Sequence, residues 1–413
     1  MTNRFHRILV LHNRYRYRGG EDTIVEQEVE LLRRKGHEVT CQIEENSKIL
    51  RQGQIATLRA LAESSWSARS YERVKAICRE QRPDLVHVHN FWFVLTPSVL
   101  AACHEEGVPV VLTLHNFRIL CAAAVLLNKQ KTCQDCVGHH PWRGVVHRCY
   151  HGSYIVSLAV ARMIEKCRRE GVWQNQVDLF VTPSQWARSV FVQGGLPASR
   201  VLVQPHFVKD PVVLGKDGMA SSENSQHVVY LGRMSKEKGL TCLLDAWERA
   251  DLPDGVKLTL AGDGPLLARL KKRAASLRRP VYFPGAIARD QAMTLLQKAS
   301  FSVLPSECYE TFGAVLIESF AHGVPVIASR IGALAEVVAD GNTGLLFEPG
   351  NCEDLAAKLS KMLHDEKGRK RMGNCARATY LERYTPDLHY EQMMAAYEKA
   401  RAVFTSRQNG IEI

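Results

Sequence analysis

The sequence predicts an α/β protein of two domains, each built on a parallel sheet. Its 413 residues, 46% hydrophobic and 23% charged, are enough for two cores of ordinary composition. Short apolar runs that read as buried strands alternate with amphipathic helices in both halves of the chain, as in doubly wound folds. A polar stretch rich in small residues separates the two series, and we assign residues 209–226 to the interdomain linker.

Charge is unevenly distributed along the chain. Residues 1–210 contain 28 basic and 19 acidic residues, a net charge of +9, whereas the remainder carries +2. Such a basic half suggests an anionic partner, either a membrane surface, a diphosphate-lipid or nucleic acid, although a solvated basic surface explains it equally well. No nucleic-acid recognition module accompanies the charge, so we expect no nucleic-acid partner.

Neither a membrane span nor a signal peptide is predicted. No segment reaches about 18 uninterrupted apolar residues, and the apolar run after Arg7 is too short for a signal peptide. We therefore expect a cytoplasmic protein whose 12 cysteines are mostly reduced thiols.

The chain begins as a β-loop-α-β unit. We predict a strand at Arg7–His12, a glycine-ended loop at Asn13–Gly20, a helix at Glu21–Lys35 that ends at Gly36, and a strand at His37–Gln42. The further predicted elements of the first domain are the helix Trp66–Arg82, the strands Leu85–His89, Pro109–Leu114 and Val177–Ser184, and the helix Gln185–Gln193.

Two features of this domain suggest ligand contacts. The aromatic run Phe91–Phe93, which contains Trp92, could form an apolar wall for an acceptor. His115 follows a predicted strand directly, and side chains at the carboxyl ends of parallel strands border the ligand cleft. We therefore favour His115 as a functional residue over His87 and His89, which lie within a strand.

Four cysteines, Cys121, Cys133, Cys136 and Cys149, follow this strand. A Cys-x2-Cys pair with two outlying cysteines has the spacing of a structural zinc site. Only one such pair is present, so a thiol-rich loop without metal remains an alternative. A bound ion would staple an irregular loop and take no part in chemistry.

The second domain is predicted to contain the strands Val228–Leu231, Leu258–Leu260 and Phe301–Leu304, a strand that ends at Tyr282–Gly285, and a final helical stretch Tyr384–Phe404. The loop Gly232–Gly239 follows the first of these strands and carries Arg233 and Lys238. Cations in a strand-to-helix loop can neutralise a diphosphate. The neighbouring Lys236 is expected to be an exposed surface residue.

Two carboxylates flank a loop-to-helix junction after the strand Phe301–Leu304. We predict a helix at Thr311–His322 with Gly313 in its first turn, where the lack of a Cβ would let a phosphate approach the backbone. Glu310 would stay in the loop beside the ligand. Glu318 lies in an almost wholly apolar helix, where a carboxylate needs a partner such as a hydroxyl group. Solvated acids are the alternative, but a nucleotide-sugar offers both the phosphates and the hydroxyls.

Several segments resemble one family, the retaining glycosyltransferases of family 4, which have the GT-B fold. They are the Glu-x7-Glu pattern at Glu310 and Glu318, "HGVPVIAS", "GALAEVV", "GNTGLLFEPGN", "GRxxxxKG" and "TLHN". The resemblance implies two facing Rossmann-like domains, with residues 1–208 binding the acceptor and 227–387 the donor, and a C-terminal helix at about 388–413 that crosses back to the first domain.

The resemblance also implies roles for individual residues: Glu310 would contact the donor sugar, Glu318 the ribose, and His115 the sugar hydroxyls near the reacting carbon. The glycine loop would approach donor and acceptor. The neighbouring Arg14, Arg16 and Arg18 could hold a phosphorylated acceptor, with solvated loop arginines as the alternative. The predicted catalytic residues are His115, Glu310, Arg233 and Lys238. The predicted donor-binding residues are Gly20, Arg233, Lys238, Glu310, Thr311, Phe312, Gly313 and Glu318, and the acceptor-binding residues are Gly19, Arg18 and Trp92.

The expected activity is transfer of a hexose from a UDP- or GDP-sugar to a saccharide acceptor with retention of configuration, in cell-surface or exopolysaccharide synthesis. No Asp-x-Asp motif occurs, so we expect no catalytic metal and no cofactor. We favour a lipid-linked acceptor reached by a peripheral protein at the inner membrane surface. A soluble acceptor, or a non-catalytic nucleotide-sugar-binding protein, are the alternatives.

Overall fold

A computed structural model describes residues 5–15, 19–129, 131–211 and 226–410, which form two compact units. Unit 1 comprises Met1–Asn128, Cys133–Pro205 and His389–Ile413, and unit 2 comprises Lys129–Thr132 and His206–Leu388. Most of the predicted linker, residues 212–225, lies outside the described residues.

Unit 1 contains a six-stranded parallel sheet in the order β2-β1-β3-β4-β7-β8. The strand order reverses between β1 and β3, so the carboxyl ends of these two strands mark the position where ligands bind in open α/β sheets. The strands are β1 (Arg7–Arg14), β2 (Glu38–Glu45), β3 (Leu85–Asn90), β4 (Val110–Thr113), β7 (Leu179–Thr182) and β8 (Val201–Val203).

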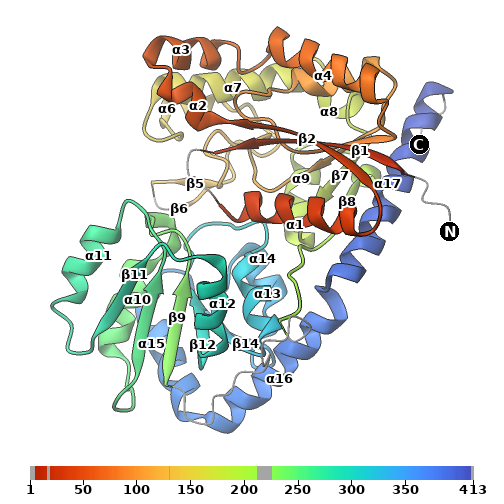
Figure 1. The fold of residues 1–413 in the computed structure, drawn as a ribbon. Helices are drawn as coiled ribbons and strands as arrows, with labels where there is room; N and C mark the ends of the chain where they lie inside the picture. Colours follow the sequence, from red (N-terminus) through yellow and green to blue (C-terminus); the bar gives the residue numbers. More distant parts are fainter. Residues whose placement is uncertain (1–4, 16–18, 130, 212–225, 411–413) are drawn as a thin grey trace. The chain divides into compact units, whose positions relative to one another are not determined.

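Helices cover both faces of this sheet (Figure 1). They are α1 (Gly20–Arg34), α2 (Asn46–Arg51), α3 (Gln54–Ala62), α4 (Ala68–Gln81), α5 (Ser98–Glu105), α6 (Trp142–Val146), α7 (Tyr154–Arg169), α8 (Val172–Asn175) and α9 (Gln185–Gln193), with a 3-10 turn at Ala198–Arg200. Two short strands, β5 (Leu127–Asn128) and β6 (Lys131–Thr132), lie in the long connection between β4 and α6.

The last helix, α17 (Pro386–Gln408), belongs to unit 1 from His389 onward. Its buried residues, among them Met393 and Tyr397, share a hydrophobic cluster with Val25 of α1 and Val10 of β1. The prediction of a C-terminal helix that returns to the first domain is therefore confirmed.

Unit 2 also contains a six-stranded parallel sheet, in the order β11-β10-β9-β12-β13-β14. Here the order reverses between β9 and β12, which places a second ligand-binding position at the carboxyl ends of those strands. The strands are β9 (His227–Leu231), β10 (Lys257–Ala261), β11 (Val281–Gly285), β12 (Phe301–Leu304), β13 (Val326–Ser329) and β14 (Gly344–Phe347).

The helices of unit 2 bury apolar faces against this sheet, as Leu243, Leu244 and Trp247 of α10 illustrate. They are α10 (Leu240–Arg249), α11 (Leu267–Ala274), α12 (Arg289–Gln297), α13 (Ala314–Ala321), α14 (Gly332–Val337), α15 (Cys352–His364) and α16 (Glu366–Arg383), with a 3-10 turn at Lys236–Lys238. Two α/β units with wholly parallel principal sheets confirm the predicted fold class. Within the described part of the chain, no helix is both long enough and apolar enough to cross a bilayer.

Candidate active site

In unit 2, the loops after β9 and β12 meet at the position where the strand order reverses. The Glu307 N–H donates to the Glu237 carbonyl at 2.8 Å, which ties one loop to the other. Gly239 has φ +66°, and a Cβ there would collide with the Pro305 carbonyl oxygen. Glycine is therefore required where α10 begins, and the loop that carries Arg233 and Lys238 lies directly against the loop that carries Glu310.

The centre of this arrangement is an ion pair between predicted site residues. Lys238 Nζ lies 2.7 Å from Glu310 Oε1, and the Ser306 hydroxyl donates to the same oxygen at 2.5 Å. Burial alone would raise the pKa of Glu310, but Lys238 and Ser306 outweigh it and hold that pKa below its usual value. Burial would lower the pKa of Lys238, but Glu310 above all raises it. Both groups are therefore charged at neutral pH.

Arg233 has an exposed side chain in the same loop. Its carbonyl accepts a hydrogen bond of 2.8 Å from the Tyr230 hydroxyl. Burial raises the pKa of Tyr230, and the charges of Lys238, Glu310 and Arg233 all act on that hydroxyl. These three predicted catalytic groups thus share one neighbourhood at the end of β9.

The helix after β12 begins later than predicted. The expected start was Thr311, but α13 runs from Ala314 to Ala321, and Gly313 is its N-cap in a left-handed conformation (φ +91°). A Cβ on Gly313 would lie 2.7 Å from Leu334 Cδ2. The left-handed backbone cannot continue a helix, so Thr311 and Phe312 remain in the loop. The Phe312 ring is buried and packs edge-on to His206 and Tyr384.

Glu318 is a buried carboxylate on α13 whose partner the sequence did not indicate. Arg289, the first residue of α12, places Nη2 3.0 Å from Glu318 Oε1. Burial raises the pKa of Glu318, and Arg289 opposes that rise. The need for a partner was predicted correctly, but Arg289 was missed because it lies 29 positions away and belongs to no motif.

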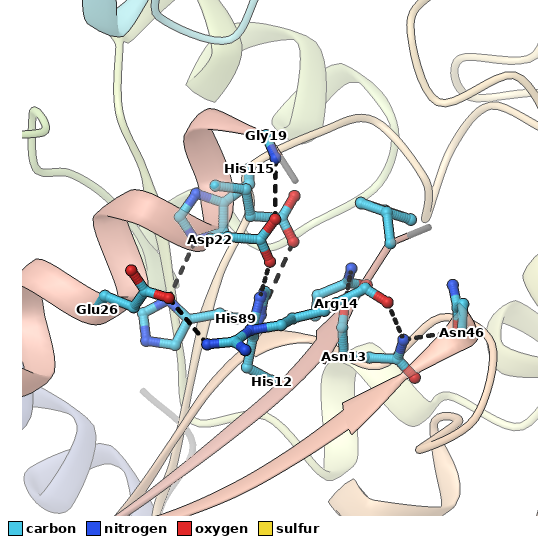
Figure 2. Close-up of polar contacts among 12 residues, drawn as sticks. His12, Asn13, Arg14, Gly19, Asp22, Glu26, Asn46, His89 and His115 are labelled. Atoms are coloured by element: carbon cyan, nitrogen blue, oxygen red, sulfur yellow. Dashed lines mark hydrogen bonds and ion pairs between the residues drawn. The ribbon is translucent and has the colours of Figure 1, made fainter. Parts of the chain in front are cut away.

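In unit 1, His115 follows the end of β4 in the sequence, and its ring is hydrogen bonded to a second histidine. His115 Nε2 is 3.1 Å from His89 Nδ1, and the two rings stack (Figure 2). His89 Nε2 lies 3.6 Å from the buried Glu28 carboxylate, which also contacts His389 at 3.2 Å. His89 therefore connects the His115 ring to a buried acid on α1.

His87 is placed differently. Its nitrogens contact Tyr397 at 2.8 Å and Thr113 at 2.7 Å, and burial lowers its pKa to about 4. His87 is thus a neutral core residue. It also lies with Glu28 and His89 in a group whose ligand atoms are mutually within 4.8 Å, but both of its nitrogens are committed to hydrogen bonds.

The glycine loop of unit 1 is fixed by Asp22 on α1. The Gly19 N–H donates to Asp22 at 2.9 Å, and the other carboxylate oxygen lies 2.8 Å from His12 Nε2 (Figure 2). Burial would raise the pKa of Asp22, but His12 and the Gly19 N–H outweigh it and keep the pKa low. Gly20 is exposed as the first residue of α1.

Of the three loop arginines, the structure describes Arg14 alone. Its Nη2 lies 2.8 Å from Glu26 Oε1, so a carboxylate already compensates its charge (Figure 2). Arg16 and Arg18, predicted to hold the acceptor, lie outside the described residues.

A buried carboxyl group beside this loop was not predicted. Asn116, the residue after His115, donates to Glu21 Oε2 at 3.2 Å and to the Tyr15 hydroxyl at 3.1 Å. Burial first, and then the neighbouring Asp22, raises the pKa of Glu21 to about 8. Such a carboxyl is largely protonated at neutral pH and can exchange a proton there. From the sequence, Glu21 is an ordinary first-turn acid of a helix.

The predicted aromatic wall is wrong. Phe91, Trp92 and Phe93 are all buried, and Trp92 is 1% exposed. Polar side chains hold the run in this buried position. Asn46 and Asn90 accept hydrogen bonds from its backbone N–H groups, and the Arg118 guanidinium lies over the Trp92 ring, 5.5 Å from its centre. The run is an inner layer of unit 1 instead of an open surface.

The four cysteines of the Cys-x2-Cys segment lie together in unit 1, around a cavity of about 20 Å³. Burial above all, together with the neighbouring thiols, raises the pKa of Cys136 and of Cys149 to about 11. All 12 cysteines of the chain are free thiols in the structure.

Comparison with known proteins agrees with this geometry. A family model described as "Glycosyltransferase Family 4" matches residues 18–210, and one described as "Glycosyl transferases group 1" matches residues 216–379. A glycogen synthase of Mycobacterium tuberculosis is 28% identical over 322 residues, which are 77% of this chain and 68% of the relative. A lipopolysaccharide 1,2-N-acetylglucosaminetransferase of Salmonella typhimurium is 26% identical over 223 residues, 50% of this chain and 58% of the relative.

Among solved structures, the Anabaena protein Alr3699/HepE in complex with UDP-glucose matches with a TM-score of 0.65 and 19% identity, over 95% of this chain and 99% of that one. At this identity the likeness concerns the fold, which is that of GT-B glycosyltransferases. Since the two family models between them account for nearly the whole chain, and their boundary falls between the two parallel sheets, the chain belongs to glycosyltransferase family 4.

Proposed function

We propose that the protein transfers a hexose from a UDP- or GDP-sugar to a saccharide acceptor with retention of anomeric configuration. The observation that carries this proposal is the Lys238–Glu310 pair, at 2.7 Å, where the strand order reverses in unit 2. A cation held there by a carboxylate is positioned for a ligand with both phosphates and hydroxyl groups.

In the proposed reaction, the bond between the anomeric carbon and the diphosphate oxygen breaks, and the acceptor oxygen bonds to that carbon on the same face. The acceptor proton passes to an oxygen of the departing phosphate. Lys238 and Arg233 stabilise the negative charge that grows on the diphosphate, a role that in other enzymes a metal ion can fill. Because two cations serve here, we propose that turnover needs no divalent metal.

The remaining donor contacts follow from the loop and helix after β12. Glu310 would bind hydroxyls of the sugar, and Glu318, held by Arg289, would accept from the ribose hydroxyls. Since the Phe312 ring is in the core, Thr311, Phe312 and Gly313 would offer backbone N–H groups to phosphate oxygens. The UDP-glucose complex of the structurally similar Anabaena protein supports this class of donor.

We assign the acceptor mainly to unit 1. His115 would contact the sugar near the reacting carbon, with its ring orientation set by His89 and Glu28. The Gly19–Gly20 loop, which Asp22 holds, would border the same site. Glu21, whose carboxyl is largely protonated at neutral pH, is the next residue in the sequence.

A lipid-linked acceptor at a membrane surface is supported by exposed apolar side chains on three helices of unit 1, α3, α6 and α7. This α3/α6/α7 face is formed by helices in which α7 packs against both α3 and α6. Its exposed apolar side chains, at 41–85% exposure, are Ile55, Leu58, Trp142, Val146, Tyr154, Ile155 and Leu158. Aromatic and aliphatic side chains of this kind insert at the boundary between headgroups and acyl chains.

Basic side chains accompany this face. The Arg148 guanidinium lies 4.1 Å from the centre of the Tyr154 ring. Arg59 and Arg143 are 80% and 68% exposed, and each forms a surface ion pair, Arg59 with Glu63 at 2.9 Å and Arg143 with Asp135 at 3.6 Å. Charge and apolar surface together suit an anionic lipid surface. We therefore place the membrane contact here, because the aromatic run at Trp92 is buried. The lipopolysaccharide transferase relative supports an acceptor of this class.

The donor assignment is tested by incubating the purified protein with a panel of UDP- and GDP-sugars and a lipid extract that contains polyprenyl-diphosphate saccharides. We expect release of one nucleotide, accompanied by labelled lipid. Nucleotide binding without sugar transfer to any lipid or soluble acceptor would favour a non-catalytic binding protein.

The membrane assignment is tested by co-sedimentation with vesicles of phosphatidylglycerol and phosphatidylcholine. Each inserted isoleucine contributes about 1 kcal/mol, so Ile55→Ser with Ile155→Ser should weaken binding roughly 30-fold. Leu381→Ser is the control, because Leu381 is also exposed (48%) but lies on α16 of unit 2. No binding to vesicles, combined with efficient transfer to a free saccharide, would establish a soluble acceptor instead.

A further inference from the structure

We propose that Cys121, Cys133, Cys136 and Cys149 bind one structural Zn²⁺ ion. The proposal is independent of the donor chemistry, since the ion would hold a loop and touch no substrate. It begins from the cavity of about 20 Å³ in unit 1, which is large enough for a single small ion or water and which all four cysteines line.

Two of the four cysteines, Cys121 and Cys136, are buried, and Cys133 and Cys149 are half-buried. Backbone hydrogen bonds hold the segment around them: the Ala124 N–H donates to the Cys121 carbonyl at 2.9 Å, and the Cys149 N–H donates to the Gly144 carbonyl at 2.9 Å. An ion bound by these four thiols would be closed off from solvent, as a structural site requires.

Local backbone strain indicates that something must hold this segment. Ala124, Leu126, Arg148 and His151 are non-glycine residues with φ between 49° and 63°. Each costs of order 1 kcal/mol and persists only where the surroundings enforce it. The segment that contains the four cysteines has little regular structure beyond α6 and two short strands, so a cross-link between cysteines would supply the missing constraint.

The close packing at Gly144 shows where the cross-link would act. A Cβ on Gly144 would lie 2.9 Å from the Ala122 Cβ, so α6 is pressed against the turn that begins at Cys121. On the other side, the Arg118 guanidinium donates to the Ala122 carbonyl at 3.0 Å and stacks over Tyr150. An ion bound here would fix α6 and Arg118 together.

Zinc is the ion that fits four thiolates without redox chemistry. Tetrahedral Zn–S bonds of about 2.3 Å place sulfurs about 3.8 Å apart. In the described part of the chain no three of these sulfurs are mutually within 4.8 Å, so the sulfurs must move inward on binding. Coordination of Zn²⁺ by four thiols releases up to four protons.

The test is elemental analysis of the full-length protein, reconstituted with Zn²⁺ under reducing conditions and freed of excess metal. We expect one zinc per chain, and roughly tenfold or greater loss of affinity in Cys133→Ser and Cys149→Ser. Cys41→Ser is the matched control, since Cys41 is also a half-buried thiol of unit 1, and it should keep the zinc.

Should the serine variants fail to fold, the wild-type protein still decides the question. Titration with a mercurial should release one zinc as four thiols react, and Co²⁺ in place of zinc should show tetrahedral thiolate absorption. Less than about one-fifth of a zinc per chain, iron with sulfide in its place, disulfides among the four cysteines by non-reducing mass spectrometry, or equal zinc loss in Cys41→Ser would each overturn the proposal.

Discussion

Replacing Lys238 by methionine tests the charge that the proposed reaction depends on. Methionine keeps the length of the aliphatic chain but removes the ammonium that lies 2.7 Å from Glu310. If that ammonium stabilises the departing diphosphate, its loss should lower kcat by about 10²–10³, or about 2.7–4 kcal/mol of transition-state stabilisation. Lys236→Met is the matched control, because Lys236 is exposed on the same 3-10 turn.

The same variant should also be less stable, by an amount that the geometry bounds. Breaking a fully buried ion pair by removing one partner costs about 3–5 kcal/mol. The side chains of Lys238 and Glu310 are 24% and 19% exposed, so water can partly solvate the Glu310 carboxylate once Lys238 is replaced. We therefore expect about 1–3 kcal/mol by urea denaturation at neutral pH.

Steady-state kinetics with the identified donor decide whether Lys238 stabilises the leaving group or only binds the donor. Unchanged kcat with a raised KM would show that Lys238 binds donor and transition state equally. An equal fall in kcat for Lys236→Met would show a general charge effect. Either result would refute the assignment of Lys238 to the leaving group.

Three further predictions follow from the site. Glu318→Ala should weaken nucleotide binding by about 1–3 kcal/mol in calorimetry, because the ribose hydroxyls lose their buried acceptor; unchanged affinity would remove Glu318 from the donor site. Glu21 has a pKa raised to about 8, so the folded protein binds its proton more tightly than the unfolded chain, and its contribution to stability falls as pH rises from about 4.5 to 8. The melting temperature of Glu21→Gln, relative to that of the wild type, should therefore rise between about pH 4.5 and 8 and stay constant above pH 8. A difference in melting temperature that does not depend on pH would contradict the burial of the Glu21 carboxyl. Brief EDTA treatment that leaves the protein's zinc content unchanged should not lower the initial rate, and inactivation that Mg²⁺ reverses would show a catalytic metal.

Strand positions were the most predictable part of the fold. β12 was predicted at Phe301–Leu304 and found there, and the predicted Leu85–His89 and Val228–Leu231 each differ from β3 and β9 by one residue at one end. Apolar runs bounded by Gly, Pro and polar residues mark buried parallel strands directly, because both faces of such strands are covered.

Local conformation and distant partners were harder to predict. The start of α13 was misplaced by three residues because Gly313 adopts a left-handed conformation that its neighbours alone do not reveal. Trp92 was expected at a surface, but whether an aromatic loop is covered depends on Arg118 and Asn46, which lie far away in sequence. Arg289 and Glu28 act through partners that only the folded chain brings near.

The anomeric configuration of the product decides whether transfer retains configuration. Proton NMR compares the anomeric signal of an α-linked nucleotide-sugar before turnover with that of the new glycosidic bond after turnover by the wild-type protein. The comparison reports whether the new bond lies on the same face of the sugar. We expect an α-linked product, formed about 10²-fold more slowly by Lys238→Met. A β-linked product would contradict retention, and with it the assignment of the acceptor's proton to the departing phosphate.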